Sequence, residues 1–242
     1  MRRFMLLLPL LTAGAPPADE AVDFRVEVDA AVTWDRAGQV RRDSITMRAV
    51  VSIAFTDSLG ATWARFTISS ASFREWTLGT TRPPIARDLS TGRSFLRRIV
   101  PGKHPTVVWT GERIPWSPAL RYLMRLPEDC FPPIGPTVSV GSRWVDTLRS
   151  QAGTLLTEWF VPRDENGERV VQGRERSRVQ ASGVDGEGRV SISRAGLIDA
   201  SIPRRGPIRY ANIHRATTEQ LIEGATTTDI LTSTMTRIVR QP

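Results

Sequence analysis

The sequence is poor in the residues that most catalytic and metal-binding sites use. It has one cysteine (Cys130), two histidines (His104 and His214) and two tyrosines among 242 residues. One cysteine cannot form an internal disulfide. A conventional zinc site would have to use nearly all of the cysteine and the two histidines, together with a carboxylate. The zincin, C-x-x-C, phosphate-loop, dinucleotide-binding, G-x-S-x-G and calcium-loop motifs are all missing. We therefore expect no metal, no cofactor and no catalytic residue, and we expect Cys130 to be buried.

Lysine is also scarce, which changes how the charge is interpreted. The formal net charge is +8, but Lys103 is the only lysine, an arginine bias that a GC-rich genome would produce. The densest basic cluster is Arg174, Arg176 and Arg178, which a strand would place on one face. This face is either simply solvated or a patch for an anionic partner such as phosphate or lipopolysaccharide. Because no aromatic residues interleave with it, we expect no nucleic acid binding.

Long apolar runs are missing except at the start of the chain. Residues 1–15, MRRFMLLLPLLTAGA, combine a positive start, an apolar run and small final residues, which is the layout of a secretory signal peptide. The run is shorter than the roughly 20 residues of a membrane span, so we expect cleavage between residues 13 and 18 and no transmembrane segment in the mature chain. A twin-arginine signal and a buried N-terminal strand are alternatives. The predicted location is periplasmic or extracellular.

Aspartate followed by glycine three residues later occurs four times, at 35–38, 57–60, 164–167 and 185–188. Aspartate suits the first position of a type I turn because its side chain accepts hydrogen bonds from the turn backbone. Glycine supplies the positive φ of the following bulge. Four such turns between strand-like runs predict a chain of β-hairpins.

The segments beside these turns alternate between apolar and polar residues. The even positions are apolar over 24–34 and the odd positions over 45–55, while 62–73 is a third, less regular strand. Residues 226–240 are dense in Thr, Ile and Val and are predicted to form a long closing strand. These runs predict an antiparallel sheet with one apolar face.

Prolines interrupt the alternation in the middle of the chain. One short helix is predicted at about 117–126, because Ser117 can cap it, Pro118 suits its first turn and Pro127 should end it. The adjacent Glu128 and Asp129 are expected to be solvated loop acids.

The predicted fold class is mainly β, either a curved antiparallel sheet or a partly closed barrel of hairpins, with the one short helix. We expect a single β-rich domain over residues 19–242, in which two β halves are joined by the Pro-rich helical segment 113–136. A two-lobed β-sandwich is the alternative.

Tryptophan is abundant for a chain with so few tyrosines, at seven residues. Most of these indoles should fill the core. Trp109 and Trp116 flank the segment before the helix and are predicted to be partly open. With Leu120, Met124 and Trp144 they are the candidate lining of an apolar ligand site.

Residues 131–147, FPPIGPTVSVGSRWVDT, follow the helix, and Gly141 is expected to permit a tight bend before the second set of strands. This segment resembles the prolines, V-x-V-G-x-x-W and Asp-Thr of an uncharacterised family of exported bacterial β-rich proteins, a domain of unknown function with many lipoprotein members. This chain lacks the lipobox cysteine of those lipoproteins. The resemblance implies export and a β-rich envelope protein, and it carries over no activity or site residue.

These features predict an exported, non-catalytic envelope protein that binds a lipid or other amphiphile, or an envelope protein, within the curve of the sheet. Two alternatives stay open. One is a hydrolase acting on an envelope polymer, since a carboxylate pair can meet only in the fold. The other is a structural or interaction module.

Overall fold

The computed structural model describes residues 21–58, 61–78, 85–88, 92, 94–100, 106–108, 122–123, 125–134, 138–150, 153–165, 167–182, 188–203, 207–223 and 225–242. The predicted signal segment lies outside these ranges. The strands are β1 (Val22–Arg36), β2 (Gln39–Ser58), β3 (Ala61–Thr77), β4 (Ile85–Asp88), β5 (Ser94–Ile99), β6 (Thr106–Val108), β7 (Arg143–Ser150), β8 (Gly153–Glu165), β9 (Glu168–Ser182), β10 (Gly188–Pro203), β11 (Tyr210–Glu223) and β12 (Thr226–Arg240), and the helix α2 covers Leu126–Cys130.

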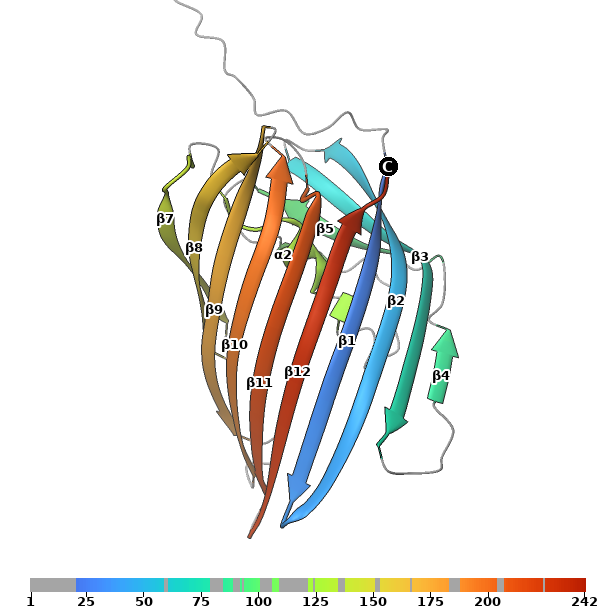
Figure 1. Ribbon diagram of the computed structural model, residues 1–242, viewed down its shortest axis with the longest axis vertical. Helices are drawn as coiled ribbons and strands as arrows, with labels where there is room; N and C mark the ends of the chain where they lie inside the picture. Colours follow the sequence, from blue (N-terminus) through green and yellow to red (C-terminus); the bar gives the residue numbers. More distant parts are fainter. Residues whose placement is uncertain are drawn as a thin grey trace, which may run out of the picture.

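All twelve strands belong to one antiparallel sheet with the order β6-β5-β3-β2-β1-β12-β11-β10-β9-β8-β7, and β4 adds to β3. The sheet curves strongly, so that both ends of the strand order turn toward the side on which α2 lies (Figure 1). Within the described ranges, the end strands β6 and β7 do not pair with each other. The predicted curved sheet is therefore confirmed. The alternative sandwich is wrong, because β1 pairs with β12 and joins the two halves in one sheet.

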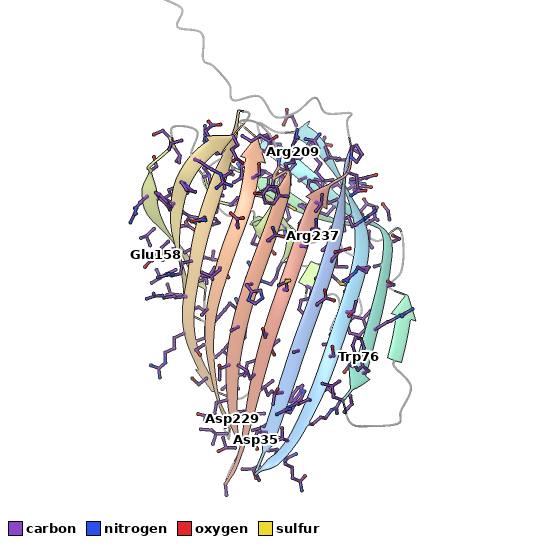
Figure 2. The ribbon with its side chains drawn as sticks, in the orientation of Figure 1. Asp35, Trp76, Glu158, Arg209, Asp229 and Arg237 are labelled. Atoms are coloured by element: carbon purple, nitrogen blue, oxygen red, sulfur yellow. The ribbon has the colours of Figure 1, made fainter. Side chains whose placement is uncertain are left out.

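The alternating sequence pattern produces the inward face of this sheet. In β1, the even residues from Val22 to Val32 are at most 7% exposed, and in β2 the odd residues from Ile45 to Phe55 are buried in the same way. The register sets Val28 between Met47 of β2 and Thr236 of β12, so neighbouring strands share this face. The outward face carries exposed polar side chains such as those of Glu158, Asp229 and Arg237 (Figure 2).

The hairpin turns follow the predicted chemistry where the structure describes them. The backbone N–H of Gly38 donates to Asp35 Oδ1 at 3.0 Å, and Gly38 has a φ of +82°. Gly167 has a φ of +78° between β8 and β9. The turn residues 59–60 and 183–187 lie outside the described ranges, but the strands beside them pair as hairpins. β12 covers the predicted closing strand from Thr226 to Arg240.

The V-G-x-x-W segment forms a corner where the second set of strands begins. Gly141 has a φ of +85°, which only glycine adopts readily, and its N–H donates to the carbonyl of Val161 at 2.8 Å. In return, the Val161 N–H donates to the carbonyl of Ser142. The register between β8 and β9 shifts at this point, so Pro162 lies in a bulge, where proline removes no ladder hydrogen bond.

Residues 117–121 and Met124 of the predicted helix lie outside the described part of the chain, whereas Tyr122 and Leu123 within it are helical. A separate short helix, α2, begins at Leu126, with Pro127 in its first turn. Proline suits this position because the first turn needs no N–H donor there. Leu126, Pro127, Asp129 and Cys130 are buried against the inward face. The expectation of solvated loop acids is therefore wrong for Asp129, whereas the expected burial of Cys130 is confirmed.

Candidate functional site

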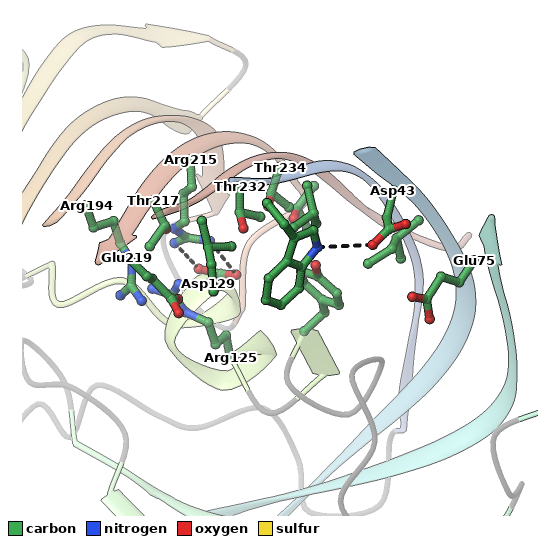
Figure 3. Close-up of a pocket in the computed structure, with 16 residues that line it drawn as sticks. Asp43, Glu75, Arg125, Asp129, Arg194, Arg215, Thr217, Glu219, Thr232 and Thr234 are labelled. Atoms are coloured by element: carbon green, nitrogen blue, oxygen red, sulfur yellow. Dashed lines mark hydrogen bonds and ion pairs between the residues drawn. The ribbon is translucent and has the colours of Figure 1, made fainter. Parts of the chain in front are cut away.

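A cavity of about 260 Å³ lies between the inward face of the sheet and the segment that leads into α2 (Figure 3). Its floor is formed by the central strands β10, β11, β12, β1, β2 and β3, and Tyr122, Arg125 and Asp129 reach it from the opposite side. The cavity therefore lies where the buried apolar half of the sheet meets a more polar half.

The strand register orders the side chains on the floor of this cavity. One row runs from Arg194 on β10 through Thr217 on β11, Thr232 on β12 and Val32 on β1 to Asp43 on β2, each directly opposite the next. Along this row the side chains are, in order, a guanidinium (Arg194), two hydroxyl groups, an apolar side chain (Val32) and a carboxylate (Asp43). Such a surface is polar at both ends and apolar between β12 and β2.

Arg215 on β11 is the most heavily bonded residue of the site, although it is only 8% exposed. Its Nε and Nη2 donate to Glu175 Oε2 and Oε1 of β9 at 2.7 and 2.8 Å. Its Nη2 and Nη1 also donate to Asp129 Oδ1 and Oδ2 of α2 at 2.6 and 3.2 Å. The guanidinium therefore joins the helix to the sheet through two paired carboxylates.

These bonds decide the charge states inside the site. Burial alone would lower the pKa of Arg215, but the charges of Asp129 and Glu175 and their hydrogen bonds outweigh burial and raise that pKa. Burial would likewise raise the pKa of Glu175, but the hydrogen bond from Arg215 and its charge lower it. Arg215 and Glu175 are therefore both ionised at neutral pH. Both carboxylates accept from a guanidinium, an arrangement that suits an ion pair better than proton exchange.

Arg125 differs from Arg215 because its guanidinium forms no hydrogen bond or ion pair with the described residues. Burial, and then repulsion from Arg215 and Arg194, lower its pKa to about 10, against a smaller attraction from Asp129 and Glu175. Three guanidinium groups thus share one end of the cavity, and among the described residues Arg125 is the one of the three without an ion pair or side-chain hydrogen bond.

A second pair of buried charged side chains that influence each other consists of Arg97 of β5 and Glu128 of α2. Arg97 of β5 is 1% exposed, and its Nε has no hydrogen-bond partner. Burial lowers the pKa of Arg97, while the nearby charge of Glu128 partly opposes this effect. Burial also raises the pKa of Glu128 to about 7, despite a hydrogen bond from its own backbone, and one of its carboxylate oxygens has no partner.

At the opposite end of the cavity from the arginines, Trp34 is held in a defined position. Its Nε1 donates to Asp43 Oδ2 at 3.0 Å, and Asp43 also accepts from Arg41 Nε at 2.8 Å and from Thr77 Oγ1 at 2.7 Å. The Asp43 carboxylate is 3% exposed and fully bonded, whereas the indole is 38% exposed. This network fixes an open aromatic surface beside Val32 and Ile45 in the lining.

The structure brings few of the sequence-predicted ligand residues to this cavity. Trp109, Trp116, Leu120 and Met124 lie outside the described residues. Trp144 is half-buried and stacks on Trp159 with 6.1 Å between ring centroids, so it lines a separate groove over β7 to β10 and not the cavity.

The predicted basic patch has the expected orientation. Arg174, Arg176 and Arg178 are exposed on the outward face of β9, with Glu175 between them pointing inward. An anionic partner for this patch stays a prediction. The same stretch of sequence thus supplies an outward row of arginines and one inward carboxylate of the site.

Sequence reasoning missed the residues that define the cavity. Arg125, Asp129, Glu175, Arg194 and Arg215 come from the segment before α2 and from α2, β9, β10 and β11, and only the fold brings them together. One signal was present in the sequence. Arg215 follows Ala211 and Ile213 at a spacing of two, which places a charge on a strand's apolar face.

The described ranges contain neither a metal-binding cluster nor a membrane-spanning helix. No group of three or more His, Cys, Asp and Glu residues is placed there to hold a metal ion. No helix among these residues is long and apolar enough to cross a membrane.

The fold and the cavity define a class of protein: an open, strongly curved antiparallel sheet that holds a mixed polar and apolar cavity in its concave face. No protein-family model matches the chain, and no curated protein matches it in sequence. Among solved structures, it is similar to one titled "Lipid-protein interactions in lipovitellin", with a TM-score of 0.54 and 10% identity. The match covers 92% of this chain but only 25% of that chain. At this identity, the likeness is one of fold.

Proposed function

We propose that this protein binds an amphiphile, such as a single-chain lipid, in the cavity on the concave face of its sheet. The observation that carries this proposal is the ordered lining of the cavity. Arginine and threonine side chains line it on β10 to β12, and Val32, Ile45 and the open face of Trp34 follow on β1 and β2.

The lining matches what an amphiphile requires. An apolar chain gains free energy when it leaves water, at about 25 cal/mol for each Å² of buried surface. A polar head needs hydrogen-bonding partners once it is out of water. This cavity supplies both kinds of surface within about 260 Å³. Since cavities for drug-sized ligands span roughly 300–1,000 Å³, the size favours one short chain or part of a longer one.

The likeness to lipovitellin supports this proposal at the level of fold. Lipid–protein interactions are the subject of that structure's title, and the similar sheet covers most of this chain. An open curved sheet can enclose a ligand without closing into a barrel, because its concave side chains surround the ligand.

We further propose that the protein is exported, to the periplasm or the cell exterior. The signal-like layout of residues 1–15 and the resemblance of residues 131–147 to exported β-rich bacterial proteins support this. Expression of the full chain, with N-terminal sequencing of the protein from each cell fraction, tests it. Recovery of only uncleaved cytoplasmic protein would contradict export.

The binding proposal is tested by filling the cavity from its floor. Thr232 points inward on β12 and lines the cavity, whereas its neighbour Ser233 points outward and is exposed. We expect Thr232→Trp to fill the cavity and to abolish the binding of dodecyl amphiphiles. Binding is measured by the displacement of a neutral fluorescent naphthylamine probe. Ser233→Trp is the matched control, because it adds the same side chain one residue away on the opposite face, and it should bind like the wild type.

Two further measurements complete this test. Lipid extraction of the purified wild type, followed by mass spectrometry, should show an amphiphile that is absent from the Thr232→Trp variant. Thermal unfolding of both variants shows that the fold survives. Equal binding by the folded Thr232→Trp and Ser233→Trp variants would refute the cavity as the binding site.

A further inference from the structure

The cavity has a distinct electrostatic end, which lies on β10 and β11. Arg125, Arg194 and Arg215 line this end together with the carboxylates of Asp129 and Glu219, whereas Asp43 and Glu75 line the other end on β2 and β3 with no arginine among the lining residues (Figure 3). The two ends are therefore chemically different, and an amphiphile can enter with only one orientation that suits its head group.

The three arginines are not equivalent. Arg215 already donates four hydrogen bonds to Asp129 and Glu175. Arg194 is a diagonal neighbour of Glu219 on the inward face, because it is opposite Thr217, and it has contacts of its own. Arg125 is the guanidinium that has no ion pair or hydrogen bond with the described residues.

Burial and repulsion by neighbouring cations both make this charge costly. Arg125 lies close enough to Arg215 and Arg194 that their repulsion lowers its pKa to about 10, together with burial. An anion between Arg125 and Arg194 would reverse this effect, because it would attract both guanidinium groups. Thr217 and Thr232 lie beside Arg194 in the register and place hydroxyl donors next to the same space.

From this arrangement we infer that Arg125, with Arg194 and the neighbouring threonine hydroxyls, receives the anionic head group of the bound amphiphile, a carboxylate or a phosphate monoester. The aliphatic chain then runs over Val32 and Ile45 toward Trp34. This inference rests on the proposed function and adds the charge of the ligand and its orientation.

The test compares dodecyl amphiphiles that differ only in the head group, each below its micelle concentration. Laurate and dodecyl phosphate should bind the wild type at least about tenfold more tightly than dodecanol, since charge-assisted hydrogen bonds are about twice as strong as neutral ones. Inorganic phosphate alone should bind far more weakly than dodecyl phosphate. The assay is displacement of the neutral naphthylamine probe, supported by isothermal titration calorimetry.

Arg125→Gln is the informative variant. It should remove the preference for laurate and dodecyl phosphate and leave the affinity for dodecanol unchanged, whereas Arg125→Lys should retain much of the preference. The melting temperature of Arg125→Gln should equal or exceed that of the wild type, because the change removes a buried charge that has no ion pair with the part of the chain that the structure describes. Arg174→Gln is the matched control, since this arginine is exposed on the outward face.

Each outcome is decisive. If dodecanol binds as tightly as laurate, or if Arg125→Gln keeps the anion preference, the head-group assignment is wrong while amphiphile binding stands. If dodecyltrimethylammonium binds best, the head lies at the Asp43 and Glu75 end and the assigned orientation is overturned. If inorganic phosphate binds as tightly as dodecyl phosphate, the site is one for free anions. If no dodecyl compound binds, the proposed function itself fails.

Discussion

Replacing Arg215 by methionine tests the energetics of the buried charges most directly. The change removes four charge-assisted hydrogen bonds and leaves Asp129 and Glu175 buried without their cation. Hydrogen bonds to charged groups contribute about 1.5–3 kcal/mol each, but the desolvation of three ions offsets much of this sum. Removing one partner of a buried ion pair typically costs about 3–5 kcal/mol, and we expect a loss in that range at pH 7.

The effect should depend on pH in a defined direction. In the wild type, the lowered pKa of Glu175 contributes stability above its unfolded pKa of about 4.3, and acidification through the folded pKa removes this contribution. Without the guanidinium, burial would raise the pKa of Glu175 above its unfolded value, so the variant would lose stability as the pH rises. The difference between the two proteins should therefore be largest at or above pH 7 and shrink toward pH 4.

Urea unfolding at several pH values measures this difference, and thermal melts should show a decrease of about 6–20 °C for the variant at pH 7. Arg174→Met is the control, because it removes an exposed arginine and should change the free energy of unfolding by less than about 0.5 kcal/mol. A loss below about 1 kcal/mol for Arg215→Met at pH 7 would refute the role given to Arg215, Asp129 and Glu175. A loss independent of pH would refute the assigned charge states.

Two substitutions and one labelling experiment test other parts of the structure. Gly173→Ala should cost about 1–3 kcal/mol in urea unfolding, because the added Cβ would lie 2.8 Å from the Trp159 ring; an unchanged midpoint would contradict this packing. Cys130 is fully buried and its pKa is raised, so a thiol reagent should label it only in denaturant, and fast labelling of native protein would contradict its burial. Glu128→Gln should stabilise the protein by up to about 3 kcal/mol at pH 7. The pKa of Glu128 is raised to about 7, above its unfolded value, so the wild type loses stability as the pH rises from 4.5 to 7 and the variant does not. The gain measured by urea unfolding should therefore grow over this pH range, and a pH-independent effect would argue against this assignment.

The strands and turns of the fold could be predicted because their signals are local. The alternation in β1 and β2 determines which residues face inward, and the Asp35 and Gly38 pair carries the chemistry of its turn. A period of two is unambiguous when one face is apolar and the other polar. The sheet's strand order could not be predicted in the same way, since no local pattern indicates that β1 pairs with β12.

The site was harder to predict because its residues break the local patterns. Glu175 lies in a stretch of alternating arginines that resembles a solvated strand, and only its partner Arg215 explains why it faces inward. Pro127 was expected to follow a helix and to lead into a loop, so Asp129 was assigned to that loop, but Pro127 also occupies the first turn of a further helix, α2. Proline is compatible with both ends of a helix, so the choice depends on tertiary packing.

The pairing of β1 with β12 also has a consequence for folding. Partners such as Phe24 and Arg240 are roughly 200 residues apart, so this contact has a high loop-closure cost and should form late. Until β12 arrives, β1 is the unpaired edge of the sheet that β1 to β6 form, and such edges readily pair with other chains. The nascent protein should therefore be prone to aggregation before its last strand is made, and it should depend on a holding chaperone during that interval.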